Sequence, residues 1–342
     1  MIKEFSFGNN ELKTIWQTFY RDNEYLSPYS SYEYNEIVYK YKRLKPQTFL
    51  QKNFFYVYYE NDKPIILFPL QKKHDNLLIF GDNISGAEYL DFIYDKNISD
   101  AQMIQAVKEL KDYQHGKMMK LYKINERSRT YECFHKNLSK MPEDMSIEEG
   151  MDRICKKIEF PDDYDMYFQQ LTKNSKSNMK KAYNRYRNSG IKMDLEVFSG
   201  PITDSELLEK IFKVNTKRSE EWMHKHRASN IVKYIKNRYF SVTAWSMQEL
   251  ATHYTFCFFL DGSLAAFMTG YLTNYNEITF PMISMNSEYA KFSPGKVMIS
   301  ESVKYLQNNT NIRVLDVSRG EERYKTEMGG HSHFNYKFSM KL

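Results

Sequence analysis

The clearest pattern along the chain is a pair of apolar runs on either side of a polar turn. Residues 254–260 and 264–273 are such runs, and Asp261-Gly262 lies between them. An Asp-Gly pair in this position is a strong signal for a β-hairpin. A third apolar run at 277–285 follows closely. We therefore predict a three-stranded antiparallel meander in the second half of the chain.

The first half contains a weaker copy of the same pattern. An aromatic-rich run at 53–60 is followed by the polar residues 61–63 and by a second apolar run at 64–70. Residues 77–80 are the candidate for a third strand. The repeated order predicts two lobes of related plan.

Helices and further strands surround the two meanders. The spacing of apolar residues predicts helices at 101–113, 205–226 and 294–308, and a long polar helix is expected at 164–188. Strands are predicted at 312–317 and 333–340, the second with Phe334, Tyr336, Phe338 and Met340 on one face. The fold class is therefore mixed α/β (α+β).

We place the boundary between the lobes near 145–165. Prolines and many acidic residues interrupt the apolar pattern in this stretch. The predicted lobes are 1–150 and 151–342.

The composition fits a globular protein with a large core. Of the 342 residues, 42% are hydrophobic and 16% aromatic, and the net charge is +6. This mild positive excess fits anionic small ligands better than a dedicated DNA-binding role. No apolar stretch is long enough to cross a membrane, and the N-terminus lacks the apolar core of a signal peptide. We expect a soluble cytoplasmic protein.

Cysteine and histidine give no metal-binding pattern. Cys133, Cys155 and Cys257 are far apart and odd in number, so we expect reduced, buried or half-buried thiols. The pairs His224/His226 and His331/His333 have no evident third ligand, and we interpret them as structural or solvent-facing. We expect no metal cofactor.

A first candidate site lies at the start of the helix predicted at 294–308. Ser293 can cap this helix and Pro294 fits its first position. Gly295 and Lys296 would offer backbone N–H groups at the positive end of the helix dipole, which suits an anion such as a pyrophosphate. An ordinary capped helix explains the same residues, and taken alone it is the favoured explanation.

A second candidate site follows the strand predicted at 312–317. Charged and polar residues gather there within ten positions, and they are Asp316, Arg319, Glu322, Tyr324 and Lys325. Ligands commonly bind at strand ends in mixed sheets. Asp316 or Glu322 is the candidate base, and Tyr324 or Lys325 the candidate proton donor. A solvated loop with local ion pairs is an equally good interpretation.

A third feature is a basic segment from Leu171 to Gly190. On a helix, Lys173, Lys176 and Lys180 would share one face, with Lys181 and Arg185 on a neighbouring face. Such a helix can hold phosphate or a nucleic-acid backbone. For any one residue, a solvated surface helix is the favoured interpretation.

Taken in order, these residues resemble a known family. The order is Phe68-Pro69-Leu70, Gly81, the patch 88–91, the basic helix, Asp261-Gly262, Ser293-Pro294-Gly295, and finally 319–325. This order resembles the CelD/BcsL-type acyltransferases of the GNAT superfamily, which are similar in plan to FemX and its two GNAT lobes. The family usually has Asp-Phe-Gly-Arg-Gly where this chain has 316–320, so Ser318 replaces a glycine.

The resemblance implies two GNAT-like lobes with mostly antiparallel mixed sheets flanked by helices. It implies transfer of an acyl group from acyl-CoA, with acetyl-CoA as the first choice, to an amine or hydroxyl of a sugar or cell-envelope precursor. The site residues would be Asp316, Arg319, Glu322, Tyr324 and Lys325, with acyl-CoA held at 293–296.

Two rival functions remain. A FemX-like enzyme would take an amino acid from aminoacyl-tRNA, and the basic helix favours it. A non-catalytic module that binds phosphate or tRNA would need residues 316–325 to be mere surface. No DNA partner is expected.

Overall fold

The chain folds into two compact units. The computed structural model describes residues 1–41, 51–81, 87–138, 147–225 and 250–342. The first unit comprises Met1–Ile154 together with His333–Leu342, and the second comprises Cys155–Ser332. The last ten residues, which the sequence places with the C-terminal lobe, therefore cluster with the first unit.

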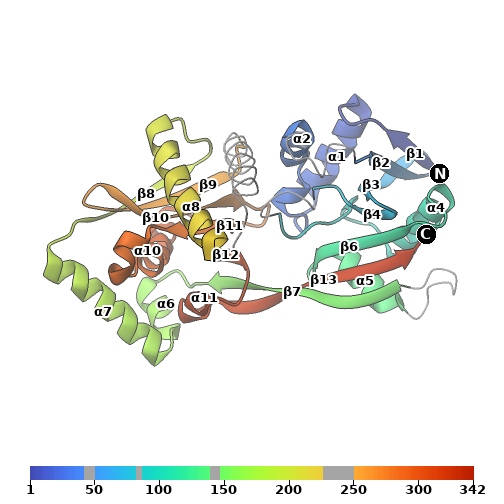
Figure 1. Ribbon diagram of the computed structural model, residues 1–342. Coiled ribbons are helices and arrows are strands. Elements are labelled where there is room, and N and C mark those ends of the chain that lie inside the picture. Colours follow the sequence, from blue (N-terminus) through green and yellow to red (C-terminus); the bar gives the residue numbers. More distant parts are fainter. Residues whose placement is uncertain (42–50, 82–86, 139–146, 226–249) are drawn as a thin grey trace. The chain divides into compact units, whose positions relative to one another are not determined.

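The first unit is built on a mixed sheet (Figure 1). Its strands are β1 (Ile2–Phe5), β2 (Asn53–Glu60), β3 (Lys63–Lys73), β4 (Asn76–Ile79), β6 (Met118–Asn125) and β13 (His331–Lys341). They lie side by side in this order, and the short strand β5 (Ile93–Tyr94) pairs with β3. Only the β4–β6 pair in this series is parallel.

Helices pack against this sheet, and α4 begins at a recognisable cap. They are α1 (Asn10–Asp22), the 3₁₀ helix η1 (Pro28–Ser30), α2 (Tyr32–Tyr41), α4 (Asp100–Tyr113) and α5 (Arg129–Asn137). Ser99 and Gln102 form a reciprocal capping box at the start of α4. Tyr336 and Phe338 of β13 both lie against the ring of Tyr131 on α5, as expected for residues two apart on one strand face.

The second unit also contains a mixed sheet. Its strands are β7 (Ile147–Glu159, whose first part belongs to the first unit), β8 (Met193–Ser199), β9 (His253–Leu260), β10 (Ser263–Leu272), β11 (Glu277–Met285) and β12 (Val314–Arg319). The order across the sheet is β7-β12-β11-β10-β9-β8. Strands β11 and β12 are parallel, whereas their other neighbours pair in the antiparallel sense.

Both predicted hairpins are confirmed, and the reason is the chemistry of their turns. Asn61 and Asp62 have φ values of 49° and 61°, and Asp261 and Gly262 have φ values of 46° and 76°. Two successive residues with positive φ match the right-handed twist of the flanking strands. Asn, Asp and Gly are the residues that tolerate this backbone best.

Helices pack on both faces of the second sheet (Figure 1). They are α6 (Tyr164–Gln170), α7 (Lys173–Ser189), α8 (Ser205–Lys225), the 3₁₀ helix η5 (Ser287–Phe292), α10 (Pro294–Asn309) and the short α11 (Arg323–Glu327). Residues of α6, α7 and α10 share one apolar core, which includes Phe256, Phe280 and Val317. Residues of α8 share another, which includes Cys257 and Phe267.

The single helix predicted at 164–188 is wrong, because two helices occupy this stretch. Helix α6 ends at Gln170, and Thr172 starts α7 by accepting a hydrogen bond from the N–H of Ser175 on its side chain. Such a cap satisfies an N–H that has no partner within the helix. Thr is one of the residue types preferred at a helix N-cap.

Two further expectations concern the chain as a whole. Within the described residues, no helix is long and apolar enough to cross a membrane. Cys133, Cys155 and Cys257 are all buried free thiols, as predicted.

Candidate active site

Strands β11 and β12 begin as neighbours and then separate. They pair in parallel at three positions, Glu277 with Val314, Ile278 with Leu315 and Thr279 with Asp316. Beyond these rows no pair joins the two strands, both of which the structure describes in full. The backbone edges of 280–285 and 317–319 thus face each other across a wedge.

A β-bulge in β11 lies at the apex of the wedge. Thr269 pairs with Met282 and Tyr271 with Thr279, so Phe280 and Pro281 together oppose the single residue Gly270. Pro281 has no N–H, and proline inside a sheet occurs at edges and bulges. Gly270 is required there, because a Cβ would lie 1.9 Å from the carbonyl oxygen of Thr279.

A second irregularity bends β12 at the same level. The pairing of β12 with β7 shifts between Asp316 and Arg319, and Ser318 has a φ of 58°. The buried carboxylate of Asp316 accepts a hydrogen bond of 2.8 Å from the N–H of Ser318 and so supports this conformation. Glycine adopts a positive φ more readily than serine, so a glycine would also suit this position.

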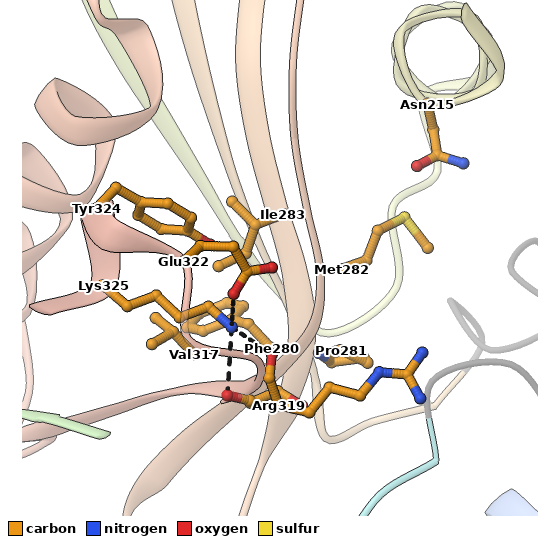
Figure 2. A pocket seen from close by; sticks show the side chains of 11 residues that line it. Asn215, Phe280, Pro281, Met282, Ile283, Val317, Arg319, Glu322, Tyr324 and Lys325 are labelled. Atoms are coloured by element: carbon orange, nitrogen blue, oxygen red, sulfur yellow. Dashed lines mark hydrogen bonds and ion pairs between the residues drawn. The ribbon is translucent and has the colours of Figure 1, made fainter. Parts of the chain in front are cut away.

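A pocket of about 370 Å³ fills the wedge. Its lining residues are Asn215, Phe280, Pro281, Met282, Ile283, Val317, Ser318, Arg319, Glu322, Tyr324 and Lys325. Figure 2 shows Glu322, Tyr324 and Lys325 on one side of β11, together with Ile283. Asn215 and Met282 lie on the other side, toward which the guanidinium of Arg319 also points. The pocket is therefore lined by side chains from both sides of β11.

Lys325 holds the backbone at the rim of the pocket. Its ammonium donates to the carbonyl oxygen of Ser318 at 3.3 Å and to that of Arg319, and it forms an ion pair of 3.0 Å with Glu322. The side chain is only 3% exposed. Three acceptors thus satisfy the three protons of this ammonium, which fixes the turn after β12.

Glu322 and Tyr324 differ from Lys325 in their access to the pocket. The side chain of Glu322 is 52% exposed and folds over Gly320, whose φ of 104° only glycine adopts readily. Tyr324 is half-buried, and its ring packs against the apolar core on the α10 side. A carboxylate and a phenol therefore face the same space.

The start of α10 differs from the sequence prediction in two respects. Ser293 has a φ of 54° and makes no side-chain capping bond, so its predicted capping role is wrong. The sequence predicts that the N–H of Lys296 is free for a ligand, but it donates to the carbonyl oxygen of Ser293 at 3.1 Å. Pro294 does occupy the first turn, and the space beside Gly295 is open, since a Cβ there would meet nothing within 4 Å.

Lys296 connects this helix start to α11. Its ammonium forms an ion pair with Glu327, which also pairs with Arg323 at 2.8 Å. Burial alone would raise the pKa of Glu327, but the hydrogen bond and charge of Lys296, together with Arg323, outweigh it and lower that pKa. A charged Glu327 therefore keeps the two helices joined at neutral pH.

The structure brings four of the five predicted charged or polar residues to one pocket. Arg319, Glu322, Tyr324 and Lys325 line it, whereas Asp316 lies buried below its apex. Ser293, Pro294, Gly295 and Lys296 are not among the lining residues. Sequence reasoning missed Asn215 and the β11 residues, although Pro281 inside a strand pattern was a visible sign of the bulge.

Among the described residues, His253, His331 and His333 are not part of the pocket lining. Burial lowers the pKa of His253 to about 4, and its ring bonds to the hydroxyl of Thr269 at 2.7 Å. His333 is buried beside Tyr89 and Asn125 in the first unit, and His331 pairs with Glu159 in the second. No cluster that could hold a metal occurs among the described residues. The side chains of His224 and His226 lie outside them.

Comparisons with known proteins show which part of the chain is similar to a known family. Residues 173–326 match the family model of an acetyltransferase (GNAT) domain. No curated protein matches the sequence. This match lies within the second unit and covers less than half of the chain.

Solved structures extend the similarity to the whole chain. FemX superposes with a TM-score of 0.63 at 9% identity and covers 99% of this chain and 97% of its own. The C-terminal domain of a putative lysylphosphatidylglycerol synthetase from Agrobacterium fabrum gives 0.55 at 8%, covering 97% and 92%. A tandem GNAT protein from the clavulanic acid biosynthesis pathway gives 0.52 at 7%, covering 100% and 99%. The fold is thus that of tandem GNAT and FemX-like proteins, as predicted.

Proposed function

We propose that the protein is an acyltransferase whose acyl donor binds in the wedge between β11 and β12. The observation that carries this proposal is the pocket of about 370 Å³ at the point where the two parallel strands separate. Its volume falls in the usual range of small-molecule sites, about 300–1,000 Å³. The unpaired strand edges offer backbone donors and acceptors to an extended, amide-containing chain.

The donor we favour is an acyl-CoA, with acetyl-CoA the first to test. Its pantetheine amides would add to the strand edges at 280–285 and 317–319. Its pyrophosphate would lie near Gly295, where the backbone is open to a ligand. No metal is needed for this chemistry.

We assign the chemical steps to residues that face the pocket. The acceptor amine or hydroxyl attacks the thioester carbonyl carbon, a new C–N or C–O bond forms, and the C–S bond breaks. Glu322 is the candidate base for the acceptor proton, and Tyr324 the candidate donor to the departing thiolate (Figure 2). Lys325 and Asp316 act as positioning residues, because their polar atoms hold the bulge of β12.

The acceptor we favour is a sugar or another cell-envelope precursor. Arg319 and Asn215 line the same pocket as Glu322, so an acceptor bound there would meet a guanidinium and an amide. These groups suit hydroxyl, carboxylate or phosphate groups. We place the reaction in the cytoplasm, where three free thiols would stay reduced.

A FemX-like transfer from aminoacyl-tRNA is the second candidate. It is supported by the fold shared with FemX and by the basic helix α7. The two donors differ in chemistry, so a binding screen separates them.

The test is a thermal-unfolding screen of the intact chain with acetyl-CoA, longer acyl-CoAs and bulk tRNA. An acyl-CoA at a hundredfold excess over its Kd should add about 2.7 kcal/mol to the free energy of unfolding. No shift with millimolar acyl-CoA contradicts the proposal. A shift with charged tRNA alone favours the second candidate, and no shift with any ligand favours a non-catalytic role.

A further inference from the structure

Helix α7 carries the excess positive charge of the chain. Its six basic residues are Lys173, Lys176, Lys180, Lys181, Arg185 and Arg187, and it has no Asp or Glu. The net charge of the whole protein is also +6. Outside α7, the numbers of basic and acidic residues are therefore equal, and the whole positive excess lies in this one helix.

The two faces of α7 differ sharply. Ser175, Met179, Ala182 and Tyr186 are buried against the core of the second unit. The exposed positions of the helix are all Lys, Arg, Asn or Ser. Figure 1 shows the helix on the outside of that unit, with α10 on its inner side. The basic face is thus turned to solvent along the whole helix, a length of about 26 Å at 1.5 Å per residue.

These six cations have no anionic partner within the described residues. Lys176 donates to the carbonyl oxygen of Gln169 at 3.1 Å, and Arg185 to that of Lys291 at 2.7 Å. Elsewhere in the same unit, Lys217 pairs with Glu288 and Lys304 with Glu301. A concentrated, uncompensated positive face is an unusual feature that calls for an external anion.

We propose that the exposed face of α7 binds the surface of a lipid bilayer that contains anionic phospholipids. A helix that is apolar on one face and has four to eight Lys or Arg on the other is a known pattern for anionic lipid binding. Lys and Arg would lie at the level of the lipid phosphates, and the Asn and Ser side chains between them would donate hydrogen bonds. The apolar face stays in the protein core, so the attachment is electrostatic and reversible.

The distribution of the charges favours a membrane over a nucleic acid. Lys173, Lys180 and Arg187 recur every seven residues along one flank, and Lys181 and Arg185 lie on the other. A plane of anionic headgroups contacts both flanks at once, whereas a nucleic-acid backbone follows a line. In addition, α7 exposes no aromatic side chain on which a base could stack.

This surface extends the proposed function without depending on it. An acceptor that is a lipid-linked envelope precursor would be concentrated at such a surface. Vesicle binding, however, needs neither donor nor turnover. A failure to bind vesicles would leave the acyl-transfer proposal standing, and a failure of acyl transfer would leave the surface testable.

The experiment is co-sedimentation of the intact protein with vesicles of phosphatidylglycerol and phosphatidylcholine at a ratio of about 40:60, in about 0.1 M NaCl. The variant Lys173→Gln/Lys180→Gln/Lys181→Gln removes three exposed cations. At about fivefold in affinity per cation, the partition coefficient should fall about a hundredfold. The matched control, Lys73→Gln/Lys96→Gln/Lys108→Gln, removes three exposed lysines of the first unit and should bind like the parent.

Thermal unfolding, salt dependence and lipid dependence test the proposal further. Thermal unfolding should be the same for the parent and both variants, because all six positions are exposed. Parent binding should vanish in about 0.5 M NaCl and on pure phosphatidylcholine. The proposal is overturned if the parent does not sediment, if the α7 variant binds as tightly as the control, or if an RNA hairpin binds α7 and the vesicles do not.

Discussion

The two units share a plan but differ in how they use a carboxylate. In each unit a three-stranded meander leads through a helix to a parallel neighbour, β6 beside β4 and β12 beside β11. In the first unit, Glu88 is 0% exposed and accepts hydrogen bonds from Arg153 at 3.0 Å and Asn335 at 3.4 Å. In the second unit, Glu322 is 52% exposed beside a pocket.

The difference shows how one fold yields a scaffold and a candidate site. A buried carboxylate with internal partners stabilises a single arrangement and offers nothing to a ligand. A half-exposed carboxylate next to unpaired strand edges is available for proton transfer. Substitutions in the first network should therefore affect stability alone, and those in the pocket should mainly affect turnover.

The largest effect is expected at Lys325, which is buried with internal partners and also lines the pocket. Lys325→Ala removes the donor to two backbone carbonyls and the partner of Glu322, so the free energy of unfolding should fall by about 2–4 kcal/mol. Lys325→Met keeps the aliphatic stem and should lose less. Urea unfolding of both variants measures this, and unchanged midpoints would show that Lys325 does not hold the turn.

Tyr324→Phe should separate turnover from stability. Removing the hydroxyl should lower kcat about a hundredfold if the phenol protonates the leaving thiolate, while the unfolding midpoint changes by less than about half a kcal/mol. Steady-state kinetics with the acyl-CoA found in the binding screen measures it. Normal turnover would remove Tyr324 from the mechanism.

Glu88→Gln should lower stability and leave turnover unchanged, which is the opposite of the result expected for Tyr324→Phe. The buried amide cannot pair with Arg153 as a carboxylate does, so stability should fall by about 1–3 kcal/mol. Arg153 keeps Asp152 as a second partner at 3.3 Å, which limits the loss. Turnover per folded molecule should be unchanged, and a drop in kcat would place part of the reaction in the first unit.

The first unit should also show a pH dependence of stability that depends on Asp91. Burial raises the pKa of this carboxyl from 3.8 to about 7, although several hydrogen bonds oppose the shift. The folded state thus holds a proton that the unfolded chain releases, so stability falls as pH rises from about 4 to about 7, by up to about 1.4 kcal/mol per pH unit. Asp91→Asn should lack this slope in a pH series of urea unfolding curves, and an identical slope would exclude Asp91 as its source.

The smallest effect is expected at Gly295. Gly295→Asp places a carboxylate where a donor phosphate would approach, so the Kd for acyl-CoA should rise about tenfold. The fold should be intact, since the new Cβ meets nothing within 4 Å. Titration calorimetry measures this, with Gly295→Ala as the control for added bulk. Equal Kd values for the Asp and Ala variants would place the anion elsewhere.

The meanders were predictable from the sequence because local chemistry determines them. Asn61-Asp62 and Asp261-Gly262 specify turns that close each hairpin, and the apolar runs on either side fix the strands. The sequence could also group Arg319, Glu322, Tyr324 and Lys325, because they lie in a short stretch at and just after the end of one strand.

Other features depend on contacts between distant residues, which no local pattern contains. The wedge requires Gly270 to face two residues of β11, and Asn215 reaches the pocket from a helix more than sixty residues earlier in the chain than Phe280. Whether Lys325 is buried under backbone carbonyls or free to donate a proton depends on how the turn at 318–322 closes. The return of β13 to the first unit depends on its pairing with β6.

Hydrogen–deuterium exchange with and without acetyl-CoA tests the central claim most directly. If the donor lies in the wedge of the second unit, the ligand should slow amide exchange at 280–285 and 317–325, while exchange at 76–79 and 118–125 stays the same. Protection confined to the strands of the first unit, or no protection at saturating acetyl-CoA, would contradict the account.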